Sequence, residues 1–257
     1  MILRRNARAI ARRSLLLGRY GSQRALGRAP QVPRPGGSTI LLLHNTLPGD
    51  AARLERYIAD HREQFVDLDS AIPAAGADRQ EPGVALTFDD GFYSNLDMAR
   101  RLARLDLQAC FYVPTDVIGL PKHQSDAFFR RPQAEGVMGW AALEELRSLG
   151  HHVGSHCRQH KPLAGTSPAH AEDQVKGSLA LLKERLGAAD HFAWPFGGLH
   201  HAPVADVVRW CREVDALPAS GVRGTNTPAR LADEGYLRRD AIDLKWLSVD
   251  MQVLLGQ

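Results

Sequence analysis

Short apolar runs alternate with longer segments of helical periodicity along the chain from residue 39 onward. Continuous apolar runs bounded by turn residues are typical of buried strands in a parallel sheet. The runs predict strands at 39–44, 65–69, 84–88, 109–113, 151–154, 191–194 and 215–219. The intervening segments predict helices near 50–64, 94–105, 139–149, 167–186 and 202–213, with a final one over 243–254.

The segment 167–186 carries the clearest helix signals. Ser167 is a suitable N-cap, Pro168 suits the first turn and Gly187 follows the last turn. Apolar residues fall on one face of this segment at helical spacing. We therefore expect a helix that packs against the sheet.

Strand–helix alternation predicts an α/β fold in which helices cover a parallel sheet. Seven strands in a domain of this length favour a closed or nearly closed barrel, and a doubly wound open sheet is the structural alternative. In a barrel, chemistry is expected on the loops that leave the C-terminal ends of the strands.

Charge divides the 257-residue chain into two parts. Residues 1–49 contain nine arginines, no lysine and no acidic residue, so the rest of the chain is net acidic although the whole carries +3. We therefore expect a basic N-terminal arm, residues 1–38, followed by one domain over 39–257. Because the basic charge is confined to the arm, a nucleic-acid partner is not expected.

The composition of the N-terminal arm indicates where in the cell the protein is expected. A secretory signal needs an apolar stretch of about 7–15 residues, and the run Ser14–Leu17 is interrupted by Gly18 and Arg19. Arginines among scattered apolar residues favour either peripheral contact with an anionic membrane or a solvated arm without a partner. Three cysteines are too few for a disulfide framework and fit a reducing compartment. The expectation is a cytoplasmic protein, with the arm at the inner membrane surface as a hypothesis.

Three polar clusters follow predicted strands. Asp89 and Asp90 end the strand at 84–88, and Gly91 lets the chain turn. Adjacent strand residues point to opposite sides, so the two acids should have different roles. The alternative is a plain Asp-Asp-Gly turn.

The second cluster contains four histidines, at 151, 152, 156 and 160. Spacing of four residues suits a zinc site, and we favour the pair His156 and His160, because His152 belongs to the preceding strand. The alternative is a solvated histidine-rich loop.

The third cluster, Phe192–Gly198, combines apolar residues with a proline and two glycines. It could form an apolar wall and direct a backbone N–H into a site. One carboxylate and two imidazoles would give a catalytic zinc-type site its three protein ligands, and the second carboxylate is then a natural general base.

From about residue 39 to 240 the sequence resembles the polysaccharide deacetylase family, the carbohydrate esterases that share the chitooligosaccharide deacetylase domain. Thr87–Gly91 matches the family's first motif letter for letter. Gly154–Leu163 resembles the second motif, an HxxxH followed by proline, and Ala193–Gly197 resembles the third. The resemblance implies a distorted (β/α)7 TIM-like barrel as a single domain.

The resemblance also implies the site. Asp90, His156 and His160 would hold one divalent metal, with zinc as the first expectation and cobalt, nickel or manganese as alternatives. Asp89 would be the general base, and the backbone N–H of Phe196 would stabilise the oxyanion.

Residues of the third motif are candidates for substrate contact: Trp194 to stack on a sugar ring, with Pro195 and Gly197 beside it. Core packing is the alternative for Trp194.

Two features depart from the family pattern. Ala193 stands where members usually have an arginine that orients the base, and no histidine follows His201 to act as the late general acid. His44, at the end of the first predicted strand, is our candidate for the missing acid, ahead of His200 and His201. Arg223, Arg238 and Arg239 are equal candidates for the missing arginine.

The expected function is hydrolysis of an N-acetyl or O-acetyl group on a cell-surface polysaccharide or its precursor, with a role in O-antigen or capsule biosynthesis as a hypothesis. The acetylated glycan would be the partner. Alternatives are a non-catalytic glycan-binding protein and an amidase that cleaves a small C–N amide.

Overall fold

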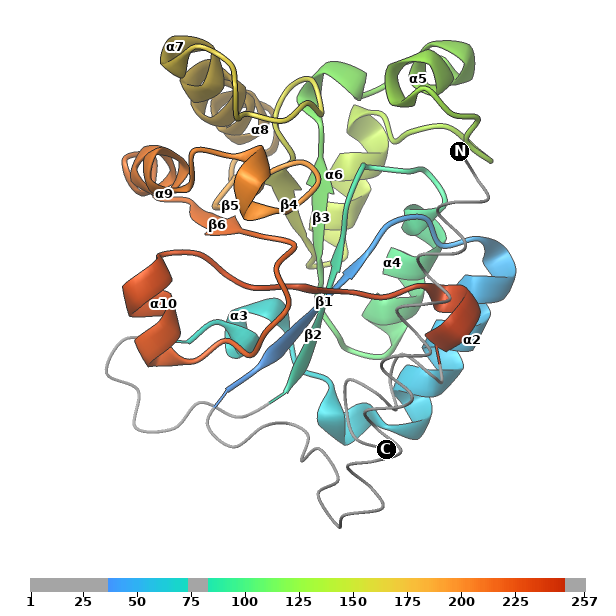
Figure 1. The fold of residues 1–257 in the computed structure, drawn as a ribbon. Helices are drawn as coiled ribbons and strands as arrows, with labels where there is room; N and C mark the ends of the chain where they lie inside the picture. The colour runs from blue at the N-terminus through green and yellow to red at the C-terminus, as the bar shows by residue number, and fades with distance from the viewer. Residues whose placement is uncertain (1–36, 74–82, 248–257) are drawn as a thin grey trace.

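The computed structural model describes residues 37–73 and 83–247, and in this part of the chain seven parallel strands form one sheet (Figure 1). The strands are β1 (Thr39–Leu43), β2 (Val84–Phe88), β3 (Cys110–Val113), β4 (His152–Ser155), β5 (His191–Ala193), β6 (Leu217–Ala219) and β7 (Asp240–Ala241). Their order in the sheet is β6-β5-β4-β3-β2-β1-β7. The fold is that of the distorted, incompletely closed (β/α)7 barrel that the sequence predicts.

One segment approaches both edges of the sheet. Strand β7 pairs with β1, with Asp240 opposite Leu41. Just before β7, Leu237 forms a parallel bridge with Ala219 of β6. Residues 237–241 therefore connect the two edges and curl the sheet into a barrel.

Helices surround the outer face of the sheet (Figure 1). Along that face α2 (Pro48–Asp60), α4 (Asn95–Arg104), α6 (Trp140–Ser148) and α8 (Ser178–Leu186) are neighbours in that order. The remaining α-helices are α3 (Leu68–Ala71), α5 (Lys122–Phe129), α7 (Pro168–Glu172), α9 (Val204–Arg212) and α10 (Pro228–Glu234). Short 3-10 turns occupy Arg62–Gln64, Thr115–Val117, Leu199–His201 and Leu244–Trp246.

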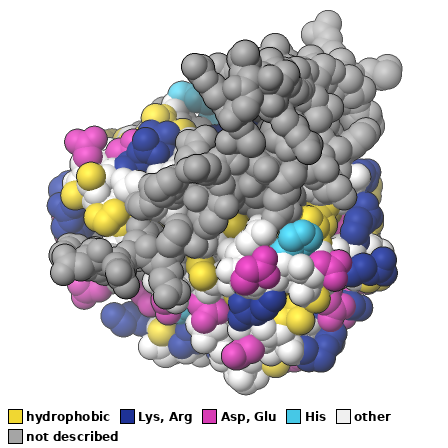
Figure 2. All heavy atoms as spheres, turned by 90° about the horizontal axis from the view of Figure 1, so that it is seen from below, with side chains coloured by type: hydrophobic (Ala, Val, Ile, Leu, Met, Phe, Trp, Pro, Cys, Tyr) yellow, Lys and Arg dark blue, Asp and Glu magenta, His cyan; other side chains and the backbone are white. Residues whose placement is uncertain are grey.

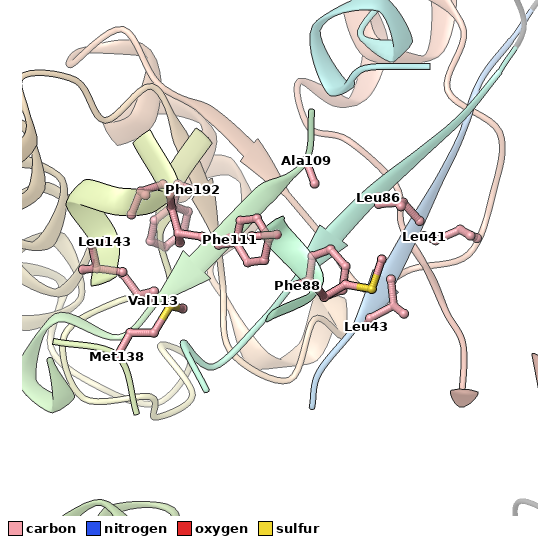
Figure 3. Packing of buried hydrophobic residues seen from close by; sticks show 14 of the residues in the cluster. Leu41, Leu43, Leu86, Phe88, Ala109, Phe111, Val113, Met138, Leu143 and Phe192 are labelled. Atoms are coloured by element: carbon pink, nitrogen blue, oxygen red, sulfur yellow. The ribbon is translucent and has the colours of Figure 1, made fainter. Parts of the chain in front are cut away.

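The core has two main parts, besides a small cluster of Phe92, Val117 and Val137. The larger part fills the space between the sheet and the outer helices, and Figure 3 shows Phe88 and Phe111 side by side within it. Their rings stack at 4.8 Å between centroids. The smaller part includes Ile40, Ala85, Tyr112 and Ala193. It lies on the other face of the strands, inside the barrel, because side chains alternate along a strand.

Most predicted elements are confirmed, and the exceptions have physical reasons. Residues 65–69 do not form a strand: Phe65 makes one bridge to Val84, and the chain then turns into α3. Leu68 and Ala71 are both fully buried, three residues apart, which is helical spacing. Strand β7, α5 and α10 were not predicted from the sequence.

The predicted helix over 167–186 is present with one interruption. Ser167 caps it by accepting from the His170 N–H, and Gly187 ends it in the left-handed conformation. A π-helical turn at Asp173–Gly177 separates α7 from α8.

Some expectations fall on residues outside the described ranges, namely most of the basic arm over 1–38 and the end of the predicted helix over 243–254. No helix in the described ranges is long and apolar enough to cross a membrane. The described side chains in Figure 2 intermingle acidic and basic groups on the face seen from below. All three cysteines are buried and unpaired, as expected.

Candidate active site

The four motif side chains lie on two loops at the same end of the sheet. Asp89 and Asp90 directly follow β2, and His156 directly follows β4, with His160 four residues further on. The C-terminal ends of parallel strands share one edge of a sheet, and a tight pair of loops there brings these residues together.

Asp90, His156 and His160 form a group suited to a metal ion. Each offers one ligand atom, and these atoms lie within 4.8 Å of one another. Asp90 Oδ1 lies 3.0 Å from His160 Nε2 and 3.7 Å from His156 Nε2. A carboxylate oxygen and two imidazole nitrogens at such separations are a donor set that zinc accepts.

Hydrogen bonds outside this group orient its members. His156 Nδ1 lies 2.7 Å from the carbonyl oxygen of Ala193, so the Nδ1–H donates and Nε2 is left with its lone pair. Asp90 Oδ2 accepts from Arg131 at 3.1 Å, whereas the buried Oδ1 has no hydrogen-bond partner of good geometry among the described residues. The Asp90 oxygen without a hydrogen-bond partner in the described ranges, Oδ1, is therefore the one that faces the two imidazoles. This arrangement of Asp90, His156 and His160 fits a bound cation.

The loops that carry these groups hold an unusual backbone conformation. Asp90, Cys157, His160 and Phe196 all have positive φ, at 76°, 64°, 49° and 65°. Left-handed backbone costs a non-glycine residue roughly 1–2 kcal/mol. Four such residues at one end of the barrel indicate that the surrounding structure imposes these conformations, as is common at functional sites.

The π-helical turn supports the histidine loop. Gln174, in that turn, accepts a hydrogen bond through Oε1 from the backbone N–H of Gln159 at 3.0 Å. Ser178, just after the turn, contacts Ser155 at 2.6 Å between hydroxyl oxygens. The π-helical turn therefore anchors the loop between the two histidines at Gln159, and α8 contacts the end of β4 at Ser155.

Asp89 is held by Arg239, and this contact identifies which of the three candidate arginines reaches Asp89. Arg239 Nη1 and Nη2 donate to the two carboxylate oxygens of Asp89 at 2.6 and 3.0 Å. Both side chains are almost fully buried. Arg223 pairs instead with Asp240, and Arg238 pairs with Glu234.

Arg239 is itself fixed inside the barrel. Its Nε donates to the carbonyl of Ser220, and Nη1 also donates to the hydroxyl of Thr87. The guanidinium carbon lies 4.8 Å from the centroid of the Tyr112 ring, a cation–π contact. A buried arginine with this many partners presents a rigid, bidentate clamp to Asp89.

The two carboxylates remain ionised in spite of their burial. Burial opposes the charge of Asp89, but the charge and hydrogen bonds of Arg239 outweigh burial and lower the pKa of that carboxyl. Burial likewise opposes the charge of Asp90, while the close contact with His160 and the charge of His44 push its pKa far below the ordinary value. Burial lowers the pKa of His156 to about 4, so its imidazole is neutral at pH 7 and able to bind a metal.

His44 lies near both carboxylates. It is exposed, one residue beyond the end of β1, and its charge contributes to lowering the pKa of Asp89 and of Asp90. The structure therefore brings this residue to the site end of the barrel.

The third motif contributes Phe196 and supporting packing. The Phe196 side chain is 57% exposed, and its ring lies 5.1 Å from that of His160. Among the described residues its backbone N–H has no hydrogen-bond partner. Pro195 and Gly197 are buried.

Trp194 corrects one expectation. Its side chain is fully buried, its indole N–H donates to the carbonyl of Gly198 at 3.1 Å, and it packs edge-on against Tyr236. Its ring is therefore part of the core and has no open face for a sugar.

Two residues of this site were not singled out by sequence reasoning. Arg131, just beyond α5, has no motif around it, and only the fold brings it to Asp90. Arg239 was one of three arginines that the sequence could not distinguish. Only the fold shows that Arg239 contacts Asp89, whereas the adjacent Arg238 contacts Glu234.

Comparisons with known proteins concern the family and the fold. A family model described as "Polysaccharide deacetylase" matches residues 76–210. No curated protein matches the chain.

Among solved structures, IcaB from Ammonifex degensii is 20% identical with a TM-score of 0.67, covering 86% of this chain and 97% of its own. The Streptococcus pyogenes deacetylase PplD, in complex with acetate, is 17% identical with a TM-score of 0.65, covering 86% and 99%. BA0330 from Bacillus anthracis, a polysaccharide deacetylase by its description, is 16% identical with a TM-score of 0.61, covering 82% and 68%. At these identities the likeness shows a common fold.

Proposed function

Since the chain belongs to the polysaccharide deacetylase family, we propose that it is a metal-dependent hydrolase that removes an acetyl group from an amino sugar of a glycan. One observation carries the proposal. A carboxylate clamped by a buried arginine, Asp89, lies directly beside a three-residue metal-binding group, with 3.8 Å between Asp89 Oδ2 and His156 Nε2. Base and metal site are thus within reach of one water molecule.

Asp90, His156 and His160 would hold the cation. Two imidazoles and one carboxylate favour zinc, with cobalt, nickel and manganese as alternatives. When bound, such a cation polarises a carbonyl oxygen and lowers the pKa of water.

Asp89 acts as the general base. Arg239 keeps it ionised and fixes both of its oxygens in place. In the forward reaction Asp89 takes a proton from the attacking water, whose oxygen bonds to the acetyl carbon. The backbone N–H of Phe196 donates to the developing oxyanion, a contribution typically worth about 3–4 kcal/mol.

The C–N bond then breaks, giving acetate and a free amine. The leaving nitrogen needs a proton. We assign this transfer to His44, whose exposed imidazole lies near both carboxylates. The substrate would approach from the same open side, past the exposed ring of Phe196.

We place the substrate among cell-surface polysaccharides or their precursors, such as those of an O-antigen or capsule. The basic composition of residues 1–38 supports contact with an anionic membrane on the cytoplasmic side. Lipid-linked glycan intermediates would be available there.

A second candidate function is glycan binding without catalysis. It is favoured by the absence of any histidine after His201. The two functions differ in one observable: a binding protein retains an acetylated glycan and releases no acetate.

The test measures metal content and acetate release together, using N-acetylglucosamine oligosaccharides as the probe. We expect Asp89→Asn to retain its metal and lose roughly 10²–10⁴-fold in rate, the usual range for a general base. Asp206→Asn, a surface change on α9, is the matched control and should behave as wild type. Equal release by Asp89→Asn and wild type would refute the assignment of the base, and glycan binding without acetate from any variant would favour the second candidate.

A further inference from the structure

A second group of metal-binding side chains lies at the opposite end of the sheet. His152 and His191 are the first residues of β4 and β5, and Asp69 belongs to α3. Parallel strands begin at one edge and end at the other, so this group is separated from Asp90 and its partners by the length of the strands. The catalytic proposal uses none of these three residues.

The group is compact. Each of the three residues offers one ligand atom, all within 4.8 Å of one another. Asp69 Oδ2 lies 3.1 Å from His152 Nε2, and Asp69 Oδ1 lies 4.0 Å from His191 Nε2. The two imidazole rings are 4.8 Å apart and nearly perpendicular, at 76°.

Asp69 Oδ2 and His152 Nε2 are close enough to share a hydrogen bond, but the separations of the whole group also suit a shared ion. Four ligands at zinc's usual distances of about 2.0–2.2 Å are separated from one another by roughly 3.4 Å in a tetrahedron. The observed 3.1 and 4.0 Å bracket that value. The 4.0 Å contact is too long for a hydrogen bond, so without an ion the carboxylate satisfies only one of the two imidazoles.

Burial provides an independent argument. His191 is only 3% exposed, and its Nδ1 is buried without a hydrogen-bond partner among the described residues. That nitrogen is not the one that faces Asp69 and Asp190, which is Nε2, so it takes no part in the proposed site. Burial matters here because it disfavours the charged imidazole. Burial lowers the pKa of His191 to about 4, which keeps its imidazole in the neutral form that binds metals.

A further acidic side chain, Asp190, and a route from solvent lie beside the group. Asp190 Oδ1 lies 3.9 Å from His191 Nε2. Asp69 and Asp190 are more than half exposed, at 61% and 56% of their side chains. Both line an open hollow of about 530 Å³, which also includes His191 and Asp215. Arg212 also lines the hollow, but the three aspartates outnumber it, so the hollow would attract a cation.

We propose that Asp69, His152 and His191 form a second, structural site for a divalent transition metal of the zinc class, with Asp190 as the fourth donor. The ion would fasten α3 to the first residues of β4 and β5. With Asp190 drawn in as the fourth ligand, two imidazoles and two carboxylates would close the coordination shell, as in structural zinc sites.

The test counts bound metal in variants that each remove one site. All 11 histidines of the chain lie within the described residues, so histidine changes can separate the sites. After equilibrium dialysis of the full chain against Zn²⁺, we expect two equivalents in wild type and one in His156→Ala/His160→Ala. We expect one equivalent in His152→Gln/His191→Gln and none when all four are changed. In the His156→Ala/His160→Ala background, Zn²⁺ should raise the melting temperature, and Co²⁺ should give the visible absorption of a tetrahedral site.

A milder variant covers the case in which the double glutamine change does not fold. Asp69 is exposed, so Asp69→Asn should fold and bind Zn²⁺ at least 10-fold more weakly in the same background. Asp60→Asn, an exposed acid at the end of α2, is the matched control and should not change the affinity. Absence of bound zinc in His156→Ala/His160→Ala, or equal affinity in Asp69→Asn, would overturn the second site. Neither result would affect the catalytic proposal, which depends on acetate release and on the other pair of histidines.

Discussion

Asp89 and Asp90 are neighbours in sequence, yet each side chain has its own environment. Asp89 turns into the barrel, where Arg239 donates to both of its oxygens. Asp90, with positive φ, turns toward His156 and His160. The division of labour between base and metal ligand therefore follows from the alternation of side chains at a strand end, combined with one left-handed residue.

Replacement of Arg239 by methionine should shift the pH dependence of catalysis. Arg239 lowers the pKa of Asp89, so in the wild type the ionised base persists as the pH falls. Without that charge, burial is opposed only by the charges of His156 and His44, so the pKa of Asp89 should rise and the acidic limb of kcat/KM should move to higher pH. Arg239→Lys keeps the charge and should shift the limb less. The measurement is the rate of acetate release as a function of pH.

Chemical denaturation should accompany that profile. Removing one partner of a buried ion pair typically costs about 3–5 kcal/mol. We expect Arg239→Met to lose stability in this range and Asp89→Asn/Arg239→Met to recover part of it. An acidic limb that stays at the wild-type pH in a folded Arg239→Met would exclude the proposed influence of Arg239 on the base.

At the scale of elements, loops at the strand ends determine the shape of the site. Phe196 and Gly197 both have φ of 65°, which turns the backbone sharply after β5. A Cβ at Gly197 would lie 2.5 Å from the Cα of Gly221, and the carbonyl of Gly197 accepts from the N–H of Gly221. The loops after β5 and β6 thus touch backbone to backbone, which only glycine permits.

Gly197→Ala should therefore be more harmful than an alanine at another left-handed glycine. Gly165 has φ of +81° and open space around its Cβ position, so Gly165→Ala carries only the conformational cost of roughly 1–2 kcal/mol. Gly197→Ala adds a backbone collision, and it should displace the N–H of Phe196. We expect a lower melting temperature than for Gly165→Ala and a loss in kcat. Equal stability and activity of the two variants would show that the Gly197–Gly221 contact can relax without consequence.

The helices and strands also show which parts of the fold can be predicted from the sequence. Strands β1 to β6 and helices α2, α4, α6, α8 and α9 are marked by apolar runs and helical periodicity. The motif residues fall at strand ends, where their chemistry can be recognised. The sequence of residues 65–69 resembles that of a strand, but the chain forms a helical turn in which the side chains of Leu68 and Ala71 are both buried. Strand β7 has two residues, too few for any pattern. The contact of Arg239 with Asp89 spans 150 positions and follows from closure of the barrel, which no local signal encodes.

At the scale of the whole molecule, Asn226 connects the beginning and the end of the described fold. Its backbone pairs with Ser38, just before β1. Its side chain donates to the carbonyl of Arg238 at 2.9 Å and accepts from the N–H of Arg238 at 2.8 Å. Asn226 is buried and lies directly before Thr227, the N-cap of α10. One side chain thus helps to hold the segment that closes the barrel.

Asn226→Ala should destabilise the protein and impair the site from a distance. It leaves the backbone groups of Arg238 without partners, and each buried unsatisfied group costs about 1–3 kcal/mol. Because Arg239 is the next residue, the clamp on Asp89 should loosen, and kcat should fall. Thr227→Ala is the control: it removes only the cap of α10, about 1 kcal/mol, and should leave kcat unchanged. Similar kcat values in the two variants would argue against a link between closure and catalysis.

The position of Arg239 near the end of the described fold has a consequence for protein synthesis. Asp89, Asp90, His156 and His160 all leave the ribosome before Arg239, and the interval from His160 to Arg239 takes on the order of ten seconds to translate. Until then the nascent chain contains Asp89, whose carboxylate is buried in the folded protein, but lacks Arg239, the cation that pairs with it. Vectorial folding can therefore produce the outer helices and most of the strands early, while the barrel interior and the catalytic base are completed together in a late step.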